Sequence, residues 1–491
     1  MKTVWLTRLR YLGALLWVFG FILPLPLVLV PFLHGVDPSF SAFAPFLLPA
    51  AISLVLGAIL NRSIRIAPLS GSGAVVVVTL GWFLVSAVGA VPFMLELDLG
   101  FVDAFFEATS GFTTTGITLL SGLDTLPGTI IFWRSLTQWI GGLGILTLFS
   151  VLVFKGEASH KLYGAESHKV ISERPAPGLF NTLKILWTIY STFTLGVFLA
   201  LLAEGVGWYD ALNHALTTLS TGGFSPHDAS IDYFRQAGFE NYRLIEYTII
   251  FGMTLGGLSF VIHYRVLRGK LSALWDSMEV KLFWRIIAGA TGLVFLNHVV
   301  EHGFSGAVDS FRYSLFQVVA LMTTTGFATK DIGASFFPAM AKQVFLLLML
   351  VGGMVGSTSG GLKVFRIGVL WKTVKRQVRK TVNPPKAVNP LLVDGKLVSR
   401  EEVGRISALF FAWIVFIIAG GLITAFFSDL TPMAAFSGIF SALGNIGPSY
   451  IPLKKWPELH PVIKVVYSIG MLAGRLEILP VLLLFSRKAW R

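Results

Sequence analysis

The chain has 491 residues, 54% hydrophobic and only 13% charged, and this low charged share excludes an ordinary soluble protein and favours an integral membrane protein. The net charge of +13 comes mainly from basic residues between apolar segments, which is typical of the positive-inside bias of membrane proteins and argues against nucleic-acid binding. The absence of cysteine excludes disulfides and thiolate metal sites.

Ten apolar segments are long enough to cross a bilayer as helices, which takes about 20 residues. They lie at 11–33, 43–60, 72–95, 130–154, 183–205, 244–264, 283–300, 340–370, 406–427 and 461–486. The first segment has no small-residue cleavage pattern, so we expect it to stay as a helix and not to be removed as a signal peptide. The sequence therefore predicts an all-α integral membrane protein that crosses the bilayer many times.

Four shorter apolar segments lie between the predicted helices, at 102–113, 209–220, 312–323 and 433–444. They are too short to span a bilayer and suit re-entrant loops, which are stable at membrane depth only where protein shields them or water reaches them. Basic residues are dense in one set of connections, above all over 363–405, and sparse in the other set. This bias predicts that both termini are cytoplasmic and that all four short segments enter from outside.

Each short segment ends in a tripeptide followed by glycine, and this pattern recurs four times. The four quartets are Thr113, Thr114, Thr115 and Gly116; Ser220, Thr221, Gly222 and Gly223; Thr323, Thr324, Thr325 and Gly326; and Gly444, Asn445, Ile446 and Gly447. The next helix in each case carries a pair of small residues, at 141–142, 256–257, 352–353 and 473–474. Small pairs are common in ordinary membrane helix packing, but a fourfold match of loop and pair is not.

The repeat predicts four unequal helix–pore loop–helix units around one central pore, preceded by an N-terminal helix pair. The corresponding divisions are a two-helix domain at 1–65 and pore repeats at 66–160, 161–270, 271–385 and 386–491. Because all four repeats run in the same direction, a pore is favoured over a transporter built from inverted repeats.

Loops of this composition suit a cation. An ion that crosses a bilayer loses water ligands, and backbone carbonyls can replace them without fixed charge. Glycine adopts the unusual backbone angles that turn carbonyls toward one axis, and Thr or Ser hydroxyls add oxygen ligands. The short helices end at the pore centre with a partial negative charge. We therefore expect K⁺ at the quartets, with a modest preference over Na⁺ because each quartet has one matched glycine and the fourth lacks hydroxyls.

The eighth predicted helix contains small and hydroxyl residues that disfavour a continuous helix below this filter. They are Gly352, Gly353, Gly356, Ser357, Thr358, Ser359, Gly360, Gly361 and the following Lys363. Glycine costs about 1 kcal/mol in a helix, so we expect a break that lines the pore cavity. A packing kink and a phosphate-binding glycine loop are the alternatives, although the loop motif GxxxxGK[ST] is missing.

Arg475 lies within the last helix, where a lone cation is costly and requires a role. We expect its side chain to face the pore and to raise the barrier for a passing cation. The alternative is a structural pair with a carboxylate such as Glu477 or Glu301.

Further polar residues lie in or near apolar segments, at Asn213, His214, Asn297, His298 and Glu301. They could bind a proton or a coupling ion, but such groups more often form hydrogen bonds between helices. Two carboxylates near the first outer mouth are expected either to attract cations or simply to be solvated there, namely Asp103 and Glu107.

The four pore loops, the TTTG-type quartets and the two extra N-terminal helices make the chain similar to the TrkH branch of the Trk/Ktr/HKT superfamily of potassium transporters. The resemblance covers nearly the whole chain. It implies K⁺ in a filter with one glycine from each quartet, no covalent or nucleotide cofactor, and a bacterial inner membrane location. Plant members often have Ser at the first glycine and favour Na⁺, which Gly116 argues against here. The resemblance also implies that the broken helix forms an intramembrane loop, which obstructs the pore, moves on opening and so acts as the gate.

The resemblance also implies partners, which are a second copy of the chain in a homodimer and cytosolic, nucleotide-binding, TrkA-like regulatory subunits. The basic stretches 363–405 and 155–174 could contact the regulator or, equally, anionic membrane lipids. The predicted function is K⁺ uptake by a gated channel or coupled transporter, and a Na⁺ or mixed Na⁺/K⁺ transporter is the alternative. A membrane-embedded enzyme acting on a lipid-linked substrate is a remote alternative, because the sequence has no HExxH motif or carboxylate cluster.

Overall fold

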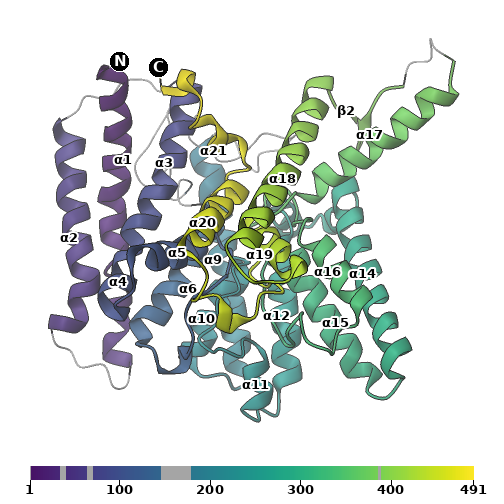
Figure 1. The fold of residues 1–491 in the computed structure, drawn as a ribbon, viewed down its shortest axis with the longest axis horizontal. Coiled ribbons are helices and arrows are strands. Elements are labelled where there is room, and N and C mark those ends of the chain that lie inside the picture. The colour runs from purple at the N-terminus through teal and green to yellow at the C-terminus, as the bar shows by residue number, and fades with distance from the viewer. Residues whose placement is uncertain are drawn as a thin grey trace.

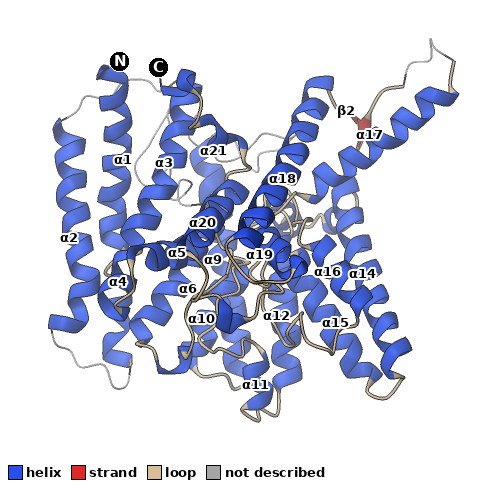
Figure 2. Cartoon of the chain, in the orientation of Figure 1, coloured by secondary structure: helices blue, strands red, loops and turns tan. Residues whose placement is uncertain are grey.

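The structure is a computed structural model that describes residues 2–33, 40–63, 70–144, 147, 178–384 and 389–490. This described part is almost entirely helical, with one hairpin formed by β1 (Leu392–Val393) and β2 (Lys396–Leu397) (Figure 2). The prediction of an all-α fold is confirmed. The first and last described residues lie on the same side of the molecule, which is called the terminal side below (Figure 1).

The N-terminal helix pair lies along one flank of the molecule (Figure 1). It consists of α1 (Lys2–Ile22), the 3-10 helix η1 (Leu25–Phe32) and α2 (Phe40–Ser63). The two long helices fit closely, because a Cβ on Gly57 would lie 2.6 Å from the backbone nitrogen of Trp17. Prolines at positions 24, 26 and 31 prevent α1 from continuing, since proline lacks the backbone N–H that an α-helix requires.

The first two repeats follow the predicted plan of two longer helices with a short helix between them. The first repeat contains α3 (Gly71–Gly89), α4 (Val91–Leu97), α5 (Phe101–Phe112), η2 (Leu123–Thr125) and α6 (Gly128–Gly142). The second repeat contains α9 (Leu179–Ala203), α10 (Trp208–Leu219), α11 (Asp232–Gln236), α12 (Tyr242–Gly257) and α13 (Phe260–Leu267). The short helices α5 and α10 end directly at the first and second quartets.

The last two repeats have the same plan with additional elements on the terminal side. The third repeat contains η3 (Leu271–Leu274), α14 (Met278–His302), α15 (Ala307–Met322), α16 (Ala339–Leu348) and α17 (Val364–Val382). The fourth contains the hairpin, α18 (Arg400–Phe426), α19 (Pro432–Gly444), η4 (Leu453–Lys455), α20 (Pro461–Arg475), α21 (Leu479–Leu483) and η5 (Arg487–Trp490). Helix α15 ends at the third quartet and α19 leads into the fourth, while α17 projects from the terminal side (Figure 1).

Six helices in the described part are long and apolar enough to cross a membrane. They are Trp5–Phe32, Phe43–Arg62, Gly71–Leu97, Phe180–Ala203, Met278–His302 and Arg400–Phe426, and they match six of the ten predicted segments. The other four predicted segments are the second helices of the repeats, called the inner helices below.

The inner helices are interrupted more often than the sequence predicted. Helices α12 and α13 meet at an angle of 103°, the loop 349–363 separates α16 from α17, and left-handed residues at 477 and 478 separate α20 from α21. The prediction named a break in the third repeat alone. In the first repeat, most of the predicted segment beyond Gly144 lies outside the described residues.

The hydrophobic interior is shared between neighbouring repeats. One buried cluster joins the N-terminal pair to the first and fourth repeats and includes Trp82, Trp133 and Trp413. Another joins the second and third repeats and includes Phe283 and Phe316. The divisions drawn from the sequence therefore remain predictions, and those at 65, 160 and 385 fall outside the described residues.

Candidate functional site

The four quartets share one backbone conformation. The second residue has a positive φ in every quartet, at 54° for Thr114, 53° for Thr221, 55° for Thr324 and 53° for Asn445. The terminal glycines also have positive φ values, from 76° to 102°. Left-handed backbone is strained for a β-branched residue such as Thr and persists only where surrounding contacts hold it. A backbone conformation shared by four quartets of three different sequences indicates a common structural role.

The four terminal glycines form a closed ring of contacts with carbonyl oxygens. A side chain in place of each glycine would meet the carbonyl oxygen of the third residue in another quartet. The pairs are Gly116 with Gly222, Gly223 with Thr325, Gly326 with Ile446, and Gly447 with Thr115. An added Cβ would overlap the oxygen in the first three pairs and lie 3.0 Å from it in the fourth. Because the fourth pair returns to the first quartet, the structure brings all four predicted loops together around one axis.

The small-residue pairs let the inner helices approach the ring from the terminal side. In three of the four small-residue pairs, a Cβ on one glycine would come within 3 Å of the carbonyl oxygen of the residue that directly precedes a quartet. The pairs are Gly141 with Phe112, Gly256 with Leu219, and Gly474 with Leu443. The helices α6, α12 and α20 end next to these glycines. The interruptions of the inner helices therefore occur where the helices contact the quartets.

A polar side chain on each short helix braces the chain that follows the quartet. Glu107 accepts hydrogen bonds from Thr118 Oγ1 at 2.8 Å and from Leu119 N at 3.0 Å. The corresponding pairs are His214 with Ser225, Gln317 with Thr329, and Ser437 with Tyr450. Sequence reasoning missed this role. The signal that could have revealed it is the same place that Glu107, His214 and Gln317 occupy in the aligned repeats.

Two buried ion pairs hold short helices against inner helices. Arg134 of α6 lies 3.0 Å from Glu107 of α5, and Arg312 of α15 lies 2.5 Å from Glu246 of α12. All four side chains are at most 1% exposed. The expectation that Glu107 attracts cations or is solvated at the outer mouth is therefore wrong, since its carboxylate is buried and already paired.

The other polar residues singled out in the sequence make structural contacts. Their partners are Tyr209 for Asn213, Ala341 for Asn297, Phe336 for His298 and Lys464 for Asp103. Glu301 is exposed. Within the described ranges, no group of three or more His, Cys, Asp or Glu side chains is arranged to hold a metal ion. The site is therefore built from backbone oxygens and hydroxyls.

On the side opposite the termini, a cavity of about 780 Å³ opens onto the ring. All four ring glycines line the cavity, together with residues from the loops that follow the quartets. Charged residues of both signs line its wall, among them Arg134, Lys330, Lys454, Asp228, Asp232 and Asp331. A hydrated ion can therefore reach the ring from this side.

The loop 349–363 lies against the ring on the terminal side. Its contacts are Thr358 Oγ1 to Thr221 Oγ1 at 3.2 Å, Ser359 Oγ to Thr323 O at 2.7 Å, and Gly360 N to Thr324 Oγ1 at 2.7 Å. A Cβ on Gly360 would also lie 2.6 Å from the carbonyl oxygen of Gly444. The small residues predicted to form a gate thus permit direct contact with three of the quartets.

The two ends of this loop meet each other. Gly352 N donates a hydrogen bond to Leu362 O at 2.9 Å, and Leu362 N donates to Leu350 O at 3.2 Å. The Cβ position of Gly361 lies 2.7 Å from Gly352 Cα, so larger residues would separate the two strands of chain. The loop is therefore a compact plug with a narrow base.

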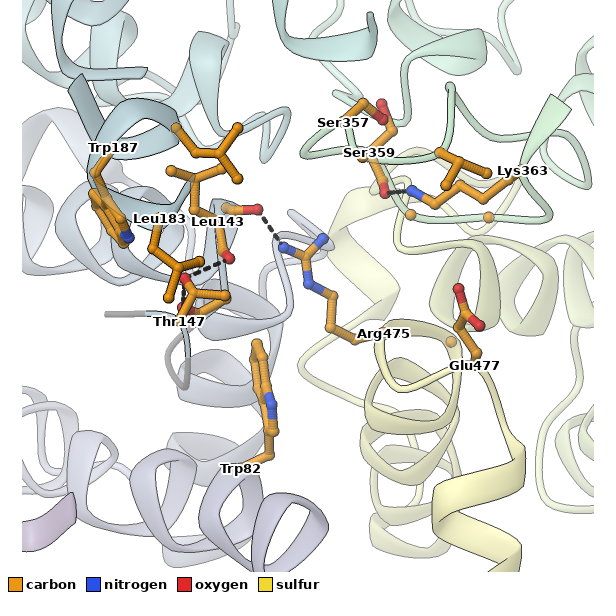
Figure 3. A pocket seen from close by; sticks show the side chains of 18 residues that line it. Trp82, Leu143, Thr147, Leu183, Trp187, Ser357, Ser359, Lys363, Arg475 and Glu477 are labelled. Carbon is orange, nitrogen blue, oxygen red and sulfur yellow. Dashed lines mark hydrogen bonds between the residues drawn. The ribbon is translucent and has the colours of Figure 1, made fainter. Parts of the chain in front are cut away.

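The guanidinium of Arg475 lies next to the ring, between the end of α6 and the loop (Figure 3). It donates hydrogen bonds to the carbonyl oxygens of Thr358 at 2.7 Å, Gly141 at 2.5 Å and Gly142 at 2.6 Å. It also lies 3.3 Å from Thr114 Oγ1 in the first quartet. Arg475 therefore connects the last repeat to the first quartet, the first inner helix and the loop.

Below the ring lies a small cavity of about 170 Å³ that Arg475, Lys363 and Ser359 line (Figure 3). The ammonium of Lys363 donates a hydrogen bond to the carbonyl oxygen of Ser359. Glu477, at the edge of the same cavity, pairs with Arg366 at 2.5 Å. A cation in this space would meet the positive guanidinium of Arg475 at short range.

Comparisons with known proteins agree with this geometry. Residues 49–490 match the family model TrkH, which is described as a cation transport protein. This chain belongs to the TrkH family. The Trk system potassium uptake protein TrkH of Escherichia coli K12 is 33% identical over 454 residues, which cover 90% of this chain and 91% of that protein. The TrkH protein of Halomonas elongata is 31% identical over 98% of both chains.

A solved TrkH structure has the same fold. The crystal structure of the potassium transporter TrkH from Vibrio parahaemolyticus matches 99% of this chain and 100% of its own chain, with a TM-score of 0.87 and 28% identity. The TrkH family is a family of transport proteins, so this chain is a multi-pass membrane transport protein and not an enzyme. The remote alternative of a membrane-embedded enzyme is thereby set aside.

Proposed function

We propose that this protein takes up K⁺ across the cell membrane through the ring formed by the four quartets. The observation that carries the proposal is the closed ring in which each terminal glycine meets a carbonyl oxygen of another quartet. Oxygen atoms from four loops around one axis are the ligands that a dehydrated monovalent cation requires. The relatives named above are potassium uptake proteins, which supports K⁺ as the ion.

The filter in this proposal favours K⁺ over Na⁺ only modestly. Hydroxyl pairs brace the first and third quartets, with 2.7 Å between Thr113 and Thr115 and 2.7 Å between Thr323 and Thr325. The fourth quartet has no hydroxyl, and the Asn445 amide donates to Thr115 Oγ1 instead. Unequal quartets with one matched glycine each offer fewer equivalent ion sites than four identical loops would. A Na⁺ or mixed Na⁺/K⁺ transporter is the alternative outcome of the experiment below.

The gate in this proposal has two parts, the loop 349–363 and Arg475. The loop contacts quartets from the terminal side, and the guanidinium joins the loop to α6. Both parts stand in the path of an ion that leaves the ring. Opening requires the loop to move away from the quartets and the positive charge of Arg475 to withdraw or be screened.

The proposed membrane arrangement has ten spans, made of the six continuous helices and the four inner segments. Both termini and the basic segment 363–405 are cytoplasmic, in a bacterial inner membrane. The proposed partners are a second copy of the chain, a TrkA-like regulatory subunit that binds nucleotide, and membrane lipids. The other candidate docking loop, 155–174, lies outside the described residues.

The decisive experiment is ⁸⁶Rb⁺ uptake into proteoliposomes with competition by K⁺, Na⁺ and H⁺, repeated with Gly116→Ser. We expect uptake that K⁺ suppresses more strongly than Na⁺ does, and we expect this preference to shrink in the variant. If Rb⁺ does not enter, or if Gly116→Ser leaves the preference between K⁺ and Na⁺ unchanged, the filter assignment is wrong.

A further inference from the structure

Glu279, in the first turn of α14, contacts the chain on both sides of the loop residues that meet the quartets. Its Oε1 atom accepts a hydrogen bond from Val355 N at 2.7 Å and another from Phe365 N at 3.3 Å. Val355 lies three residues before Thr358, the first of the loop residues that contact the quartets, and Phe365 lies in the first turn of α17. One carboxylate oxygen of Glu279 therefore holds the chain at Val355 and at Phe365, on either side of the loop residues that must move away from the quartets.

The two backbone groups suit a carboxylate partner. The first N–H groups of an α-helix have no acceptor within the helix, and Phe365 N is one of these groups. An acceptor oxygen at that position also lies at the positive end of the helix dipole. The position of the loop relative to α14 therefore depends on this side chain.

The same turn of α14 contacts the β1–β2 hairpin. Asp394, which has a left-handed φ of 49° at the hairpin tip, accepts a hydrogen bond from Met278 N at 2.8 Å. Lys372 Nζ of α17 donates to the carbonyl oxygen of Leu392 at 2.8 Å and ties the hairpin to α17. Two successive residues of α14 thus contact the hairpin on one hand and the loop on the other.

A small hydrophobic cluster packs these parts together on the terminal side. Its buried members are Phe365, Val369, Leu391, Val393, Val398 and Ile406. Val355 of the loop and Met278 of α14 pack against it. The hairpin, α17 and Val355 of the loop therefore share one hydrophobic core. Displacement of the hairpin is transmitted to the loop through this core.

We propose that Glu279 is the positioning residue that couples the cytoplasmic hairpin to the intramembrane loop, so that movement of the hairpin changes the fraction of open pores. This inference rests on the proposed function, because the proposed function gives the loop its gating role. The hydrogen bonds that carry it run from Glu279 to the loop and not to the ring. Glu279 therefore sets the balance between closed and open loop without changing the ligands of the ion.

Accessibility of the loop tests this coupling directly. The chain has no cysteine, so a single Ser359→Cys substitution provides a reporter without background. Ser359 is 2% exposed and lines the small cavity below the ring, so a thiol there reacts only when the loop leaves the quartets. The measurement is the rate at which 2-sulfonatoethyl methanethiosulfonate, a negatively charged reagent, modifies this thiol in the full chain in proteoliposomes.

We expect Glu279→Ala to raise the modification rate by about tenfold, since two backbone hydrogen bonds are lost. Asp394→Ala should raise the rate less, because it removes the hairpin contact alone. Glu279→Gln keeps an oxygen acceptor and should stay near the rate of the reporter chain. The matched control is Glu301→Ala, which removes an exposed carboxylate near the other end of α14 and should change nothing.

Transport provides the second measurement. In chains with Ser359 intact, Glu279→Ala should increase ⁸⁶Rb⁺ uptake and leave the ratio of K⁺ to Na⁺ competition unchanged. A changed ratio would overturn the proposal, because the residue would then act on the ring. An effect of Glu279→Gln as large as that of Glu279→Ala would overturn the role of the acceptor oxygen.

The remaining outcomes separate this inference from the proposed function. A modification rate in Glu279→Ala equal to that in Glu301→Ala overturns the coupling. If Glu279→Ala does not yield folded protein, Asp394→Ala carries the test, and an unchanged rate in that variant overturns the coupling too. Failure of the unsubstituted chain to take up Rb⁺ contradicts the proposed function alone, since thiol modification does not require transport.

Discussion

Arg475 donates a hydrogen bond to the carbonyl oxygen of Thr358 at 2.7 Å, which joins the last inner helix to the loop 349–363 of the third repeat. Thr358 in turn contacts Thr221 in the second quartet at 3.2 Å, and Arg475 contacts Thr114 in the first quartet at 3.3 Å. The loop, Arg475 and the quartets therefore form one connected hydrogen-bonded network. A change in any one of the three is expected to affect the other two.

Arg475→Ala is predicted to increase ⁸⁶Rb⁺ uptake by roughly tenfold. The substitution removes a positive charge next to the ring and the hydrogen bonds that hold the loop to α6, and each bond to a charged group contributes about 1.5–3 kcal/mol. Arg475→Lys keeps the charge but lacks the planar fork that reaches several carbonyls, so its uptake should lie between those of wild type and Arg475→Ala. Unchanged uptake in Arg475→Ala would contradict a gating role.

Gly326→Ala is predicted to lower ⁸⁶Rb⁺ uptake severalfold and, as proposed for Gly116→Ser, to weaken the preference for K⁺ over Na⁺. The new Cβ would overlap the carbonyl oxygen of Ile446, and the φ of 81° at this position is strained for any L-residue with a side chain. Overpacking costs about 1–3 kcal/mol and backbone strain a similar amount, so the ring should widen or lose its shape. The measurement is ⁸⁶Rb⁺ uptake at equal amounts of folded protein.

The matched control for Gly326→Ala is Gly289→Ala on α14, where an added Cβ would have no heavy atom within 4 Å. Gly289→Ala should transport like wild type, because alanine favours the helix and meets no obstacle. Similar losses in both variants would show that the effect is a general cost of replacing glycine and not a property of the ring.

The place of the ring could be predicted from the sequence because the repeat is local. Each quartet follows its short helix directly, so aligned segments identify Gly116, Gly223, Gly326 and Gly447 without knowledge of the fold. The glycine-rich stretch from Gly356 to Gly361 could be found for the same reason, since its composition by itself disfavours a helix. Local patterns of this kind are visible before any contact between distant residues is known.

Contacts between distant residues could not be predicted in this way. The pairing of Glu279 with Val355 joins residues 76 positions apart, and neither residue type stands out in the sequence. The breaks in α12–α13 and α20–α21 depend on carbonyl oxygens of other helices that lie against Gly256 and Gly474. Such effects arise from tertiary packing, which overrides the apolar pattern that predicted continuous helices.

Arg134→Ala is predicted to destabilise the protein by about 3–5 kcal/mol, because it leaves the buried carboxylate of Glu107 without its charged partner. The measurement is thermal unfolding in detergent, followed by tryptophan fluorescence. The control is Arg405→Ala in the surface pair with Glu401, where the side chains are 53% and 85% exposed and the expected loss is below about 1 kcal/mol. Equal losses in both variants would contradict a special role for the buried pair.

His227, in the loop after the second quartet, is predicted to make stability depend on pH. Its ring forms an ion pair with Asp124 and lies 3.2 Å from Asp210 Oδ2, and it stacks on Tyr233. Partial burial acts to lower the pKa of His227, but the hydrogen bonds and charges of Asp210 and Asp124 outweigh burial and raise the pKa above its ordinary value of 6.5. The protonated form therefore stabilises the connection between the first and second repeats.

Because the pKa is raised in the folded protein, this stabilisation is complete below about pH 6.5 and is lost as the pH rises through the folded pKa. The unfolding temperature of wild type should therefore fall between about pH 6 and pH 8, and the fall should be smaller in His227→Gln. His460→Gln, at an exposed histidine, is the control and should retain the wild-type dependence. His214 lies near His227, with 6.4 Å between ring centroids. An unchanged pH dependence of the unfolding temperature in His227→Gln would therefore assign the effect to another ionisable group near His227.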